Sequence, residues 1–372
     1  MTDLHDALAA LRSPASAWIY SPTRFRERLA RLREALAPST ILYAMKACAD
    51  PAILAAATEA ADGIECASTG ELNAAAGAGA RRLAFSGPAK TAADFAAAAA
   101  PPVPVVVHAE SVRQLDGLAA AGFTGPVALR VNRGPALPGT HQMTGTPTPF
   151  GIDPVDVAAA LDRARALGLD VAGFHLHAVS NCLDAAAYIG HVRSALAWSR
   201  QTARSNRLDL RYVNVGGGLG ADPRGETIDL GALAAGLEGL DTTGIELVFE
   251  PGRYLAQAAG WYVADVVDVK TVAGQVFAII RGGTHHFRLP AAWGYSHPFT
   301  VLRGPGRPEA SNTQVRVCGE LCTPRDVLNT GQNVDTIATG DRLLFANAGA
   351  YGWEISHDRF LDHARPTRIV ID

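Results

Sequence analysis

The sequence has no long apolar run and no strong excess of charge of either sign. Its apolar stretches are short and interrupted, and none reaches the roughly 20 residues that a membrane-spanning helix needs. The formal net charge is −3, which gives no electrostatic case for binding nucleic acid or an anionic membrane. The N-terminal segment carries Asp3 and Asp6 and has no apolar core, so we expect no secretory signal peptide.

Cysteine is also scarce. The chain of 372 residues contains five cysteines, which are Cys48, Cys66, Cys182, Cys318 and Cys322. They are scattered and odd in number, and the last two are too far apart for a C-x-x-C redox pair. We therefore expect reduced thiols and a cytoplasmic protein.

Short apolar segments alternate with alanine-rich segments from Ile41 to Gly252. The alanine-rich segments, such as 51–61 and 155–168, repeat their apolar positions at helical spacing. The expected strands span residues 41–46, 64–68, 82–87, 103–109, 127–132, 171–178, 212–217 and 245–252. Eight such units predict an α/β fold, a parallel (β/α)8 barrel of the TIM type. An open doubly wound sheet is the alternative, but no G-x-G-x-x-G motif follows the first strand.

The helical rhythm stops after about Trp261. Strand-like segments separated by turn-rich loops follow, at 261–272, 276–283, 313–320, 341–351 and 367–372. We expect a second domain there, a C-terminal β-barrel or β-sandwich completed by an N-terminal strand at 16–22. The predicted division is a barrel at 23–260 and a β domain made of 1–22 and 261–372. The loop 133–149 is rich in Pro, Gly and Thr and is a candidate mobile segment.

Polar residues fall at or just past the carboxyl ends of the predicted strands. They are Lys46, Ser68, His108, Asn132, His177, Gly216 to Gly218, Glu250 and Arg253. In a parallel barrel these ends converge on one face, where active sites are built. We therefore expect residues far apart in the sequence to share one pocket.

Lys46 ends the apolar run ILYAM. A lysine there would be partly desolvated, which disfavours the ammonium and frees the amine as a nucleophile for carbonyl groups. That is the chemistry of a Schiff-base lysine. The alternative is a lysine that only marks the end of a strand, and this residue alone does not decide between the two.

Two motifs near the end of the predicted barrel suit a phosphate group. Gly216, Gly217 and Gly218 follow YVNV, and glycines let backbone N–H groups approach an anion closely. An ordinary tight turn is the alternative. The EPGR motif ends the eighth strand, where barrels commonly hold phosphate. Arg253 would hold phosphate oxygens, or Glu250 would be its structural partner.

The motif HLHAVSN places His175 and His177 on the same face of a strand. Alternating histidines are able to bind a metal. No third ligand is evident, however, because the pair at 285–286 belongs to the other predicted domain. A histidine stacked on an aromatic ligand, with Ser180 donating to the phosphate of that ligand, fits the pocket better, and we expect no metal.

The β domain carries candidate residues of its own. Cys322, in CGELCTPRDVL, is either a thiol acid or a small buried residue, and residue type alone favours the buried role. Arg288, in HHFRLP, either recognises a carboxylate or is a solvated strand residue. Tyr351 follows small residues that would let its loop approach a ligand closely.

Together these motifs resemble the fold-type III pyridoxal-phosphate decarboxylases, the family of the ornithine, arginine and diaminopimelate decarboxylases. The resemblance runs nearly from end to end, from AWIYSPTRFRERL to RPTRIVID. The matching motifs are, in order, YAMKAC, ASTGEL, HLHAVSN, the three glycines, EPGR, the segment from Cys322 to Asp326, and GAY. This ordered set is far more specific than any one motif.

The resemblance implies a role for each residue. Lys46 would form the Schiff base with the cofactor, pyridoxal 5'-phosphate, and His177 would stack on its ring. Glu250 would pair with the ring nitrogen and so keep the ring a strong electron sink when carbon dioxide leaves; alanine racemases of this fold type have an arginine there. Cys322, from the neighbouring subunit, would protonate the quinonoid carbon, which implies a homodimer with shared active sites. The residues implied to hold the phosphate and the rest of the cofactor are Ser180, Gly216, Gly217, Gly218, Gly252, Arg253 and Tyr351.

Departures from the family pattern bear on the substrate. Amine-producing members usually follow the cysteine with Asp or Glu, which binds a distal amine, whereas this chain has Thr323. Arg288 is kept where diaminopimelate decarboxylases bind a distal carboxylate. Val179 replaces a usual glycine and tightens its turn. With His286 and Asp326, the threonine and the arginine make up the expected substrate-binding set.

The CTP element and the tail SHDRFLDHARP resemble the decarboxylases of carboxylate-siderophore pathways. The favoured prediction is therefore decarboxylation of an amino acid or of its polycarboxylate conjugate, such as a citryl-diaminopropionate-type intermediate. One alternative is a diaminopimelate or basic amino acid decarboxylase acting on ornithine, lysine or arginine. The other is a non-catalytic homologue that only binds its ligand. Such a homologue would be expected to lose the lysine or the phosphate contacts, and the chain keeps both.

Overall fold

The computed structural model describes residues 3–100, 103–134, 137–139 and 141–372. The chain divides into two compact units. The first, the barrel unit, consists of Arg26–Ala221 and Thr227–Tyr254. The second, the β unit, consists of the segment up to Phe25, Asp222–Glu226 and Leu255–Asp372.

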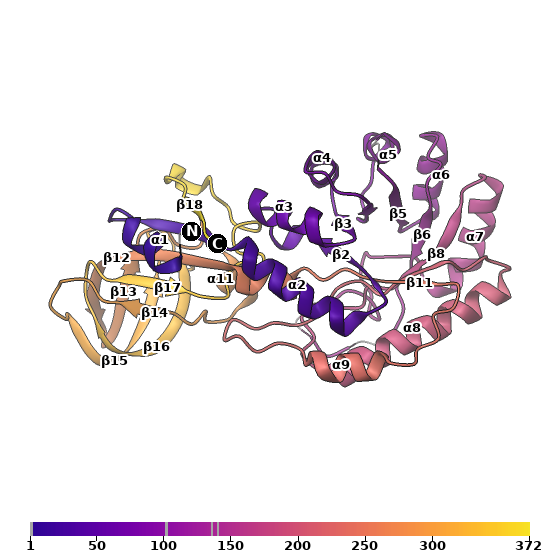
Figure 1. The fold of residues 1–372 in the computed structure, drawn as a ribbon. Helices are drawn as coiled ribbons and strands as arrows, with labels where there is room; N and C mark the ends of the chain where they lie inside the picture. The colour runs from indigo at the N-terminus through magenta and orange to yellow at the C-terminus, as the bar shows by residue number, and fades with distance from the viewer. Residues whose placement is uncertain (1–2, 101–102, 135–136, 140) are drawn as a thin grey trace. The chain divides into compact units, whose positions relative to one another are not determined.

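Eight parallel strands of the barrel unit close into a barrel in the order β10-β11-β2-β3-β4-β5-β6-β8 (Figure 1). They are β2 (Thr40–Ala44), β3 (Gly63–Cys66), β4 (Leu83–Phe85), β5 (Val105–Ala109), β6 (Val127–Arg130), β8 (Val171–His175), β10 (Tyr212–Asn214) and β11 (Glu246–Phe249). Each overlaps one of the eight predicted strands. The predicted (β/α)8 barrel is therefore confirmed, and the open doubly wound sheet is wrong.

Helices connect the barrel strands, and short polar residues fix where most of them begin. They are α2 (Pro22–Leu36), α3 (Pro51–Ala60), α4 (Thr69–Gly77), α5 (Ala92–Ala99), α6 (Val112–Ala120), α7 (Val157–Ala166), α8 (Ala185–Ser205) and α9 (Leu230–Leu237), with 3-10 turns η1 (Met45–Ala47) and η2 (Pro154–Asp156). Side-chain caps at Asp50, Ser68, Thr91, Ser111 and Asp184 each accept a backbone N–H from the first turn. The strand-end residue Ser68 is thus a helix cap. None of the described helices is long and apolar enough to cross a membrane.

Inward-facing side chains of the barrel form two successive layers. Because side chains alternate along a strand, residues two apart point to the same side. The apolar layer consists of Leu42, Ala84, Val106, Ala128, Ala172, Tyr212 and Val248. The layer toward the carboxyl ends of the strands is polar and buried, and consists of Glu65, Ser86, His108, Arg130, His175, Asn214 and Glu250. On β8 the offset is three residues, because the pairing of β6 with β8 shifts register.

The β unit is built on an eight-stranded mixed sheet. Its strands are β1 (Ser16–Tyr20), β12 (Gly260–Val272), β13 (Gln275–Ile280), β14 (Thr300–Leu302), β15 (Ala310–Cys318), β16 (Val327–Ile337), β17 (Arg342–Phe345) and β18 (Thr367–Val370). Strand β1 pairs antiparallel with β12 and parallel with β18. The prediction that an N-terminal strand completes this sheet is therefore confirmed.

Two strands of this sheet lie outside the predicted segments. Strand β16 has the sequence VLNTGQNVDTI, which is mostly polar, and its pairing with β15 holds it in place. A local apolar pattern does not reveal a strand that depends on its neighbour. Strand β14 has only three residues. The remaining helices are short, and are α1 (Leu4–Ala10), α10 (Arg253–Ala256), α11 (Leu289–Trp293), η3 (Gln257–Ala259) and η4 (Phe360–Asp362).

The loop at 133–149 is partly ordered by a two-stranded sheet. Strand β7 (His141–Gln142) pairs antiparallel with β9 (Val179–Ser180). Residues 135, 136 and 140 of this loop lie outside the described residues, so the prediction that it is mobile stays a prediction. The pairing joins the loop to the motif HLHAVSN at the carboxyl end of β8.

Candidate active site

Lys46 and Glu65 form an ion pair at the carboxyl ends of β2 and β3. Lys46 lies in η1, directly after β2, and its side chain is 40% exposed, whereas that of Glu65 is 1% exposed. Burial raises the pKa of Glu65, an effect that Lys46 opposes and Glu250 reinforces. The Lys46 side chain therefore lies beside a carboxylate that holds a proton more readily than usual.

Glu250 accepts a hydrogen bond from an amide and lies beside two imidazoles. Nδ2 of Asn214 donates to Oε1 of Glu250 at 2.7 Å. Nε2 of His175 lies 3.3 Å from Oε2, and Nδ1 of His108 lies 3.8 Å from Oε1. Glu65 interacts electrostatically with both Lys46 and Glu250, so all three groups lie at the same end of the barrel.

Three histidines, His108, His175 and His177, gather at the same end of the barrel. The rings of His108 and His175 lie 4.1 Å apart, and those of His175 and His177 lie 6.3 Å apart and within 6° of parallel. Desolvation lowers the pKa of all three well below the ordinary value of 6.5, so they are neutral near pH 7. His177 is half-buried, which leaves its ring accessible for stacking.

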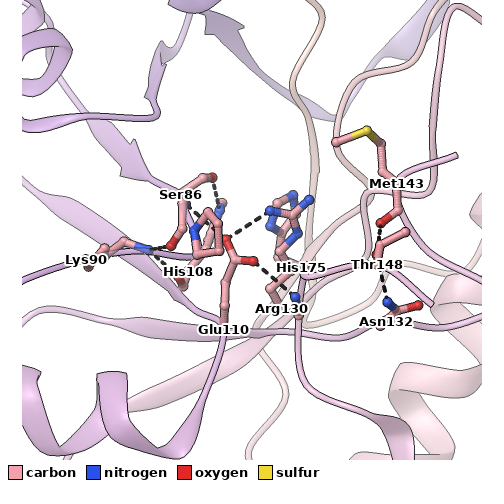
Figure 2. Close-up of polar contacts among 12 residues, drawn as sticks. Ser86, Lys90, His108, Glu110, Arg130, Asn132, Met143, Thr148 and His175 are labelled. Carbon is pink, nitrogen blue, oxygen red and sulfur yellow. Dashed lines mark hydrogen bonds and ion pairs between the residues drawn. The ribbon is translucent and has the colours of Figure 1, made fainter. Parts of the chain in front are cut away.

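Three of these side chains lie close enough to suggest a metal site. His108, His175 and Glu250 each bring one ligand atom within 4.8 Å of the other two. Both ring nitrogens of His108 are already engaged, however, Nδ1 with Ser86 (Figure 2) and Nε2 with Tyr212. Hydrogen bonding therefore accounts for the arrangement.

Gly216, Gly217 and Gly218 form a tight turn after β10. A Cβ atom on Gly216 would lie 2.4 Å from the ring of His177, and one on Gly218 would lie 2.5 Å from the carbonyl oxygen of Val179. The φ angles of these two glycines are 74° and 91°, which favour glycine. The turn therefore packs directly against the segment that carries His177 and Ser180.

The EPGR motif packs against the turn that carries Lys46. The backbone N–H of Ala44 donates to the carbonyl oxygen of Pro251 at 3.2 Å. A Cβ atom on Gly252 would lie 2.9 Å from Cβ of Ala47. Glycine at this position therefore lets the end of β11 approach the Lys46 turn closely.

The sequence patterns did not single out the ion pair between Arg130 and Glu110. Nη1 of Arg130 lies 2.9 Å from Oε1 of Glu110, and both side chains are at most 5% exposed (Figure 2). Glu110 also accepts the backbone N–H groups of Gly87 and Gly151, so its burial is compensated. The signal that would have found Arg130 is a charged residue two positions after Ala128, an inward-facing apolar residue of a buried strand.

Asp326 joins two loops of the β unit that carry predicted site residues. Its carboxylate accepts the N–H of Thr284 at 2.6 Å and that of Leu321 at 2.8 Å. Thr284 precedes the HHFRLP segment, and Leu321 precedes Cys322. This geometry favours a positioning role for Asp326, which was expected to contact the substrate.

His286 and Arg288 differ in their accessibility. Nδ1 of His286 lies 3.2 Å from Oγ of Ser16, and Nε2 lies 3.0 Å from the carbonyl oxygen of Ala364. Burial lowers the pKa of His286 to about 3. The buried imidazole is suited to supporting its loop, whereas Arg288 is exposed and is suited to meeting a ligand.

The other predicted residues of the β unit lie on loops. Cys322 is exposed, so the expectation that it is a buried small residue is wrong. Thr323 is half-buried, and its hydroxyl accepts the N–H of Arg325 at 3.3 Å. Tyr351 has a φ of 57°, a strained conformation for a residue with a side chain, and its ring lies 5.7 Å from that of Trp293.

The predicted site residues thus divide between the two units. The barrel unit brings together Lys46, His177, Ser180, Gly216, Gly217, Gly218, Glu250, Gly252 and Arg253 at the carboxyl ends of its strands. The β unit carries His286, Arg288, Cys322, Thr323, Asp326 and Tyr351.

Comparisons with known proteins agree with this geometry. Residues 23–257 match the family model described as pyridoxal-dependent decarboxylase, pyridoxal binding domain. The 2-[(L-alanin-3-ylcarbamoyl)methyl]-2-hydroxybutanedioate decarboxylase of Staphylococcus aureus is 34% identical over 98% of this chain and 96% of its own length. The diaminopimelate decarboxylase of Deinococcus radiodurans is 33% identical over 97% of this chain and 91% of its own.

A solved structure has the same fold. The diaminopimelate decarboxylase of Helicobacter pylori, complexed with L-lysine, superposes with a TM-score of 0.85 over 100% of this chain and 94% of its own, at 24% identity. Fold and family match together define a fold-type III enzyme. The chain belongs to the pyridoxal-dependent decarboxylases, and its cofactor is pyridoxal 5'-phosphate.

The polar layer of the barrel fits this cofactor. Both ring nitrogens of His175 and Nδ1 of His177 lack a hydrogen-bond partner within the described part of the chain, so they are available to ligand groups. The Lys46 amine and the Glu250 carboxylate lie at the same end of the barrel, where both interact with Glu65, and the three-glycine turn lies next to His177. An aldehyde, a ring nitrogen and a phosphate each find a suitable group there.

Proposed function

We propose that this enzyme decarboxylates an amino acid carried on a polycarboxylate, of the citryl-diaminopropionate type. The observation that carries the proposal is Thr323, an uncharged residue where amine-producing members have an acid. A threonine cannot neutralise a distal ammonium, whereas the exposed Arg288 suits a carboxylate. The Staphylococcus aureus relative, whose name describes a citrate-derived conjugate, supports the same substrate class.

Each site residue is proposed to have its own role in the reaction. Pyridoxal 5'-phosphate, when bound, supplies the aldehyde and the electron-accepting ring that decarboxylation requires. The Lys46 amine is the nucleophile for the aldehyde, and Oε2 of Glu65 accepts the proton that Nζ gives up. The Glu250 carboxylate would hold a proton on the ring nitrogen, and His177 would stack on the ring. The Cys322 thiol returns a proton to the carbon that has lost its carboxylate.

Further residues hold the phosphate and the substrate. Those proposed for the phosphate are Ser180, Gly216, Gly217, Gly218, Gly252, Arg253 and Tyr351. Arg288 and Thr323 face the substrate, while Asp326 and His286 fix the loops that carry them. Cys322 is proposed to come from a second copy of the chain, which makes the enzyme a cytoplasmic homodimer with shared sites.

Replacement of Lys46 tests the reaction. Lys46→Ala is expected to remove the visible absorbance of the bound cofactor and to lower turnover by roughly 1,000-fold or more, as the loss of a nucleophile does. Lys270→Ala is the control, because Lys270 lies on β12 and, within the described residues, its ion pair is with Asp268. Unchanged release of carbon dioxide by Lys46→Ala would reject the proposed function.

Parallel substrates test the specificity. The release of carbon dioxide is measured with a citryl-diaminopropionate-type conjugate and with free diaminopimelate, ornithine and lysine. We expect kcat/KM to favour the conjugate by about tenfold or more, since each free diamino acid places an ammonium near an uncharged threonine. The second candidate is a diaminopimelate decarboxylase, which Arg288 and the 33% identical relative favour. Equal or better turnover of diaminopimelate would establish that candidate instead.

A further inference from the structure

A chain of hydrogen bonds crosses the polar layer of the barrel from the Glu250 carboxylate to Ser86. It consists of Asn214, Tyr212, His108 and Ser86, all of them at most 6% exposed. Nδ2 of Asn214 lies 2.8 Å from the Tyr212 hydroxyl. That hydroxyl lies 3.1 Å from Nε2 of His108. Nδ1 of His108 in turn lies 2.9 Å from Oγ of Ser86, and Figure 2 shows these two residues. The chain joins β10, β5 and β4 across the barrel.

Asn214 fixes which group donates and which accepts in each of these hydrogen bonds. Its Oδ1 accepts the backbone N–H of Gly216 at 2.8 Å, and because an N–H only donates, this contact fixes which end of the amide is the oxygen. The two hydrogens on Nδ2 are then donated to Oε1 of Glu250 and to the Tyr212 hydroxyl. One amide therefore orients the carboxylate and begins the chain.

The Tyr212 hydroxyl determines which ring nitrogen of His108 accepts a hydrogen bond. Since the Tyr212 oxygen accepts from Asn214, its own hydrogen needs an acceptor, and Nε2 of His108 is the acceptor within reach. Desolvation lowers the pKa of His108 well below its ordinary value, so the ring is neutral and carries one hydrogen. With Nε2 accepting, that hydrogen is on Nδ1 and is donated to Ser86.

The last residue of the chain, Ser86, is the one that relates it to Glu65, the partner of Lys46. Because Ser86 accepts from His108, its hydroxyl hydrogen is free to point to Glu65, whose ionised form the Ser86 hydroxyl favours. Oε1 of Glu65 has no hydrogen-bond partner in the described residues and is therefore open to that hydrogen, while Oε2 is the oxygen that pairs with Lys46. Rotation of the Ser86 hydroxyl toward this oxygen would give every donor in the chain an acceptor and would end the chain at a carboxylate.

We propose that Asn214, Tyr212, His108 and Ser86 are positioning residues, joined in one directed chain of hydrogen bonds that couples the Glu250 carboxylate to the Glu65 carboxylate beside Lys46. None of the four needs to touch the substrate. The chain holds both carboxylates in their ionised orientation, one for the ring nitrogen and one for the lysine. Its geometry belongs to the barrel alone, whereas its consequence for catalysis rests on the proposed roles of Lys46 and Glu250.

The first test measures the tautomer of His108 in the cofactor-free protein. Long-range proton–nitrogen NMR spectra of the 11 histidines distinguish a ring nitrogen that carries hydrogen from one that does not. We expect His108, identified by the loss of its signals in His108→Asn, to be neutral with the hydrogen on Nδ1. Tyr212→Phe is expected to shift the signals of this histidine. Tyr43→Phe removes a buried hydroxyl that donates to the carbonyl oxygen of Cys48 and is expected to leave them unchanged.

A hydrogen on Nε2 of His108 would overturn the proposed direction. So would an unchanged spectrum in Tyr212→Phe. If the His108→Asn chain does not fold, the one histidine that responds to both Tyr212→Phe and Ser86→Ala identifies the ring. The absence of any histidine that responds to both would also contradict the chain.

The second test measures coupling with a double-mutant cycle. Ser86→Ala and Tyr212→Phe are each expected to weaken cofactor binding about tenfold, and the double variant no more than about tenfold, since one break already interrupts the chain. Ser199→Ala is the control, because it removes a buried hydroxyl that has no hydrogen-bond partner in the described chain. Effects that multiply, to about 100-fold, would mean two independent structural defects and no chain. Failure of the native protein to bind the cofactor would reject the proposed function and leave the tautomer result standing.

Discussion

The Lys46 ammonium is paired with the Glu65 carboxylate, which lies 19 residues later on the neighbouring strand. An ammonium has no lone pair with which to attack a carbonyl, so the pair must transfer or lose a proton before the lysine reacts. Glu65 is the nearest acceptor for that proton, and burial already raises its pKa. The same side chain therefore both stabilises the resting ammonium and offers a route to the free amine.

Glu65→Gln tests this dual role. The amide keeps the size of the side chain but carries no charge, so the ammonium of Lys46 loses its counter-ion and the free amine is favoured at lower pH. We expect the pH of half-maximal cofactor uptake by the cofactor-free protein to fall by about one unit, as followed by visible absorbance. Glu59→Gln, which removes an exposed partner of Arg26, should leave that pH unchanged. A rise in the midpoint, or no change, would contradict the role of Glu65.

Two glutamates at opposite ends of β11 provide a matched pair. Glu250→Gln removes the charge proposed to hold a proton on the ring nitrogen, and we expect turnover to fall by roughly 100-fold or more. Glu246 is the first residue of the same strand, and its carboxylate binds Arg82 and Thr40. Glu246→Gln therefore serves as the control. We expect Glu246→Gln to lower the free energy of unfolding by about 1 kcal/mol or less and to leave the turnover of the enzyme unchanged. Equal loss of activity in the two variants would show that Glu250 acts only through the fold.

The sequence predicts the barrel well because its signal is local. Strand and helix alternation depends on neighbours in the chain, and strand ends mark Lys46 and Glu250 as site residues. The contact between Tyr212 and His108, by contrast, joins residues 104 positions apart, and only closure of the barrel brings them together. Glu65 was overlooked because its strand is buried on both faces, which hides the two-residue alternation that makes Glu65 point inward.

Thr323 is expected to set the preference for the distal group of the substrate. Thr323→Glu introduces a carboxylate next to Cys322, and we expect kcat/KM for ornithine or lysine to rise by about tenfold relative to the polycarboxylate conjugate. Thr323→Gln has the same length without the charge, so it separates the effect of charge from that of size. A preference that moves equally in both variants would assign the effect to size and remove the charge argument.

The proposed sharing of active sites between subunits predicts that two inactive variants recover activity when they are mixed. Lys46→Ala and Cys322→Ala are each expected to be nearly inactive. When equal amounts are unfolded and refolded together, random pairing places both changes in one site of each mixed dimer and leaves the other site intact. About a quarter of the native activity is then expected. Cys318→Ala in place of Cys322→Ala is the control, because Cys318 lies at the end of β15 and is expected to be active on its own. No recovery would mean that both residues act within one subunit.

The lowered pKa values of the buried histidines predict how the free energy of unfolding depends on pH. Desolvation lowers the pKa of His108, His175 and His177 well below 6.5, and burial lowers that of His297 to about 4. Below about pH 6.5 the unfolded chain therefore binds protons that the folded chain does not, so the free energy of unfolding is fully present above this pH and falls as the pH drops.

Each such histidine contributes up to about 1.4 kcal/mol per pH unit to this fall. Urea unfolding midpoints measured between about pH 7.5 and about pH 5 should therefore decrease steeply toward acid. His297→Gln removes one of these groups and should flatten the decrease between pH 6.5 and its folded pKa of about 4, whereas His5→Gln, an exposed position on α1, should not. A midpoint that stays constant over this range would mean that the histidines are protonated in the folded protein, and it would exclude the neutral His108 that the hydrogen-bond chain requires.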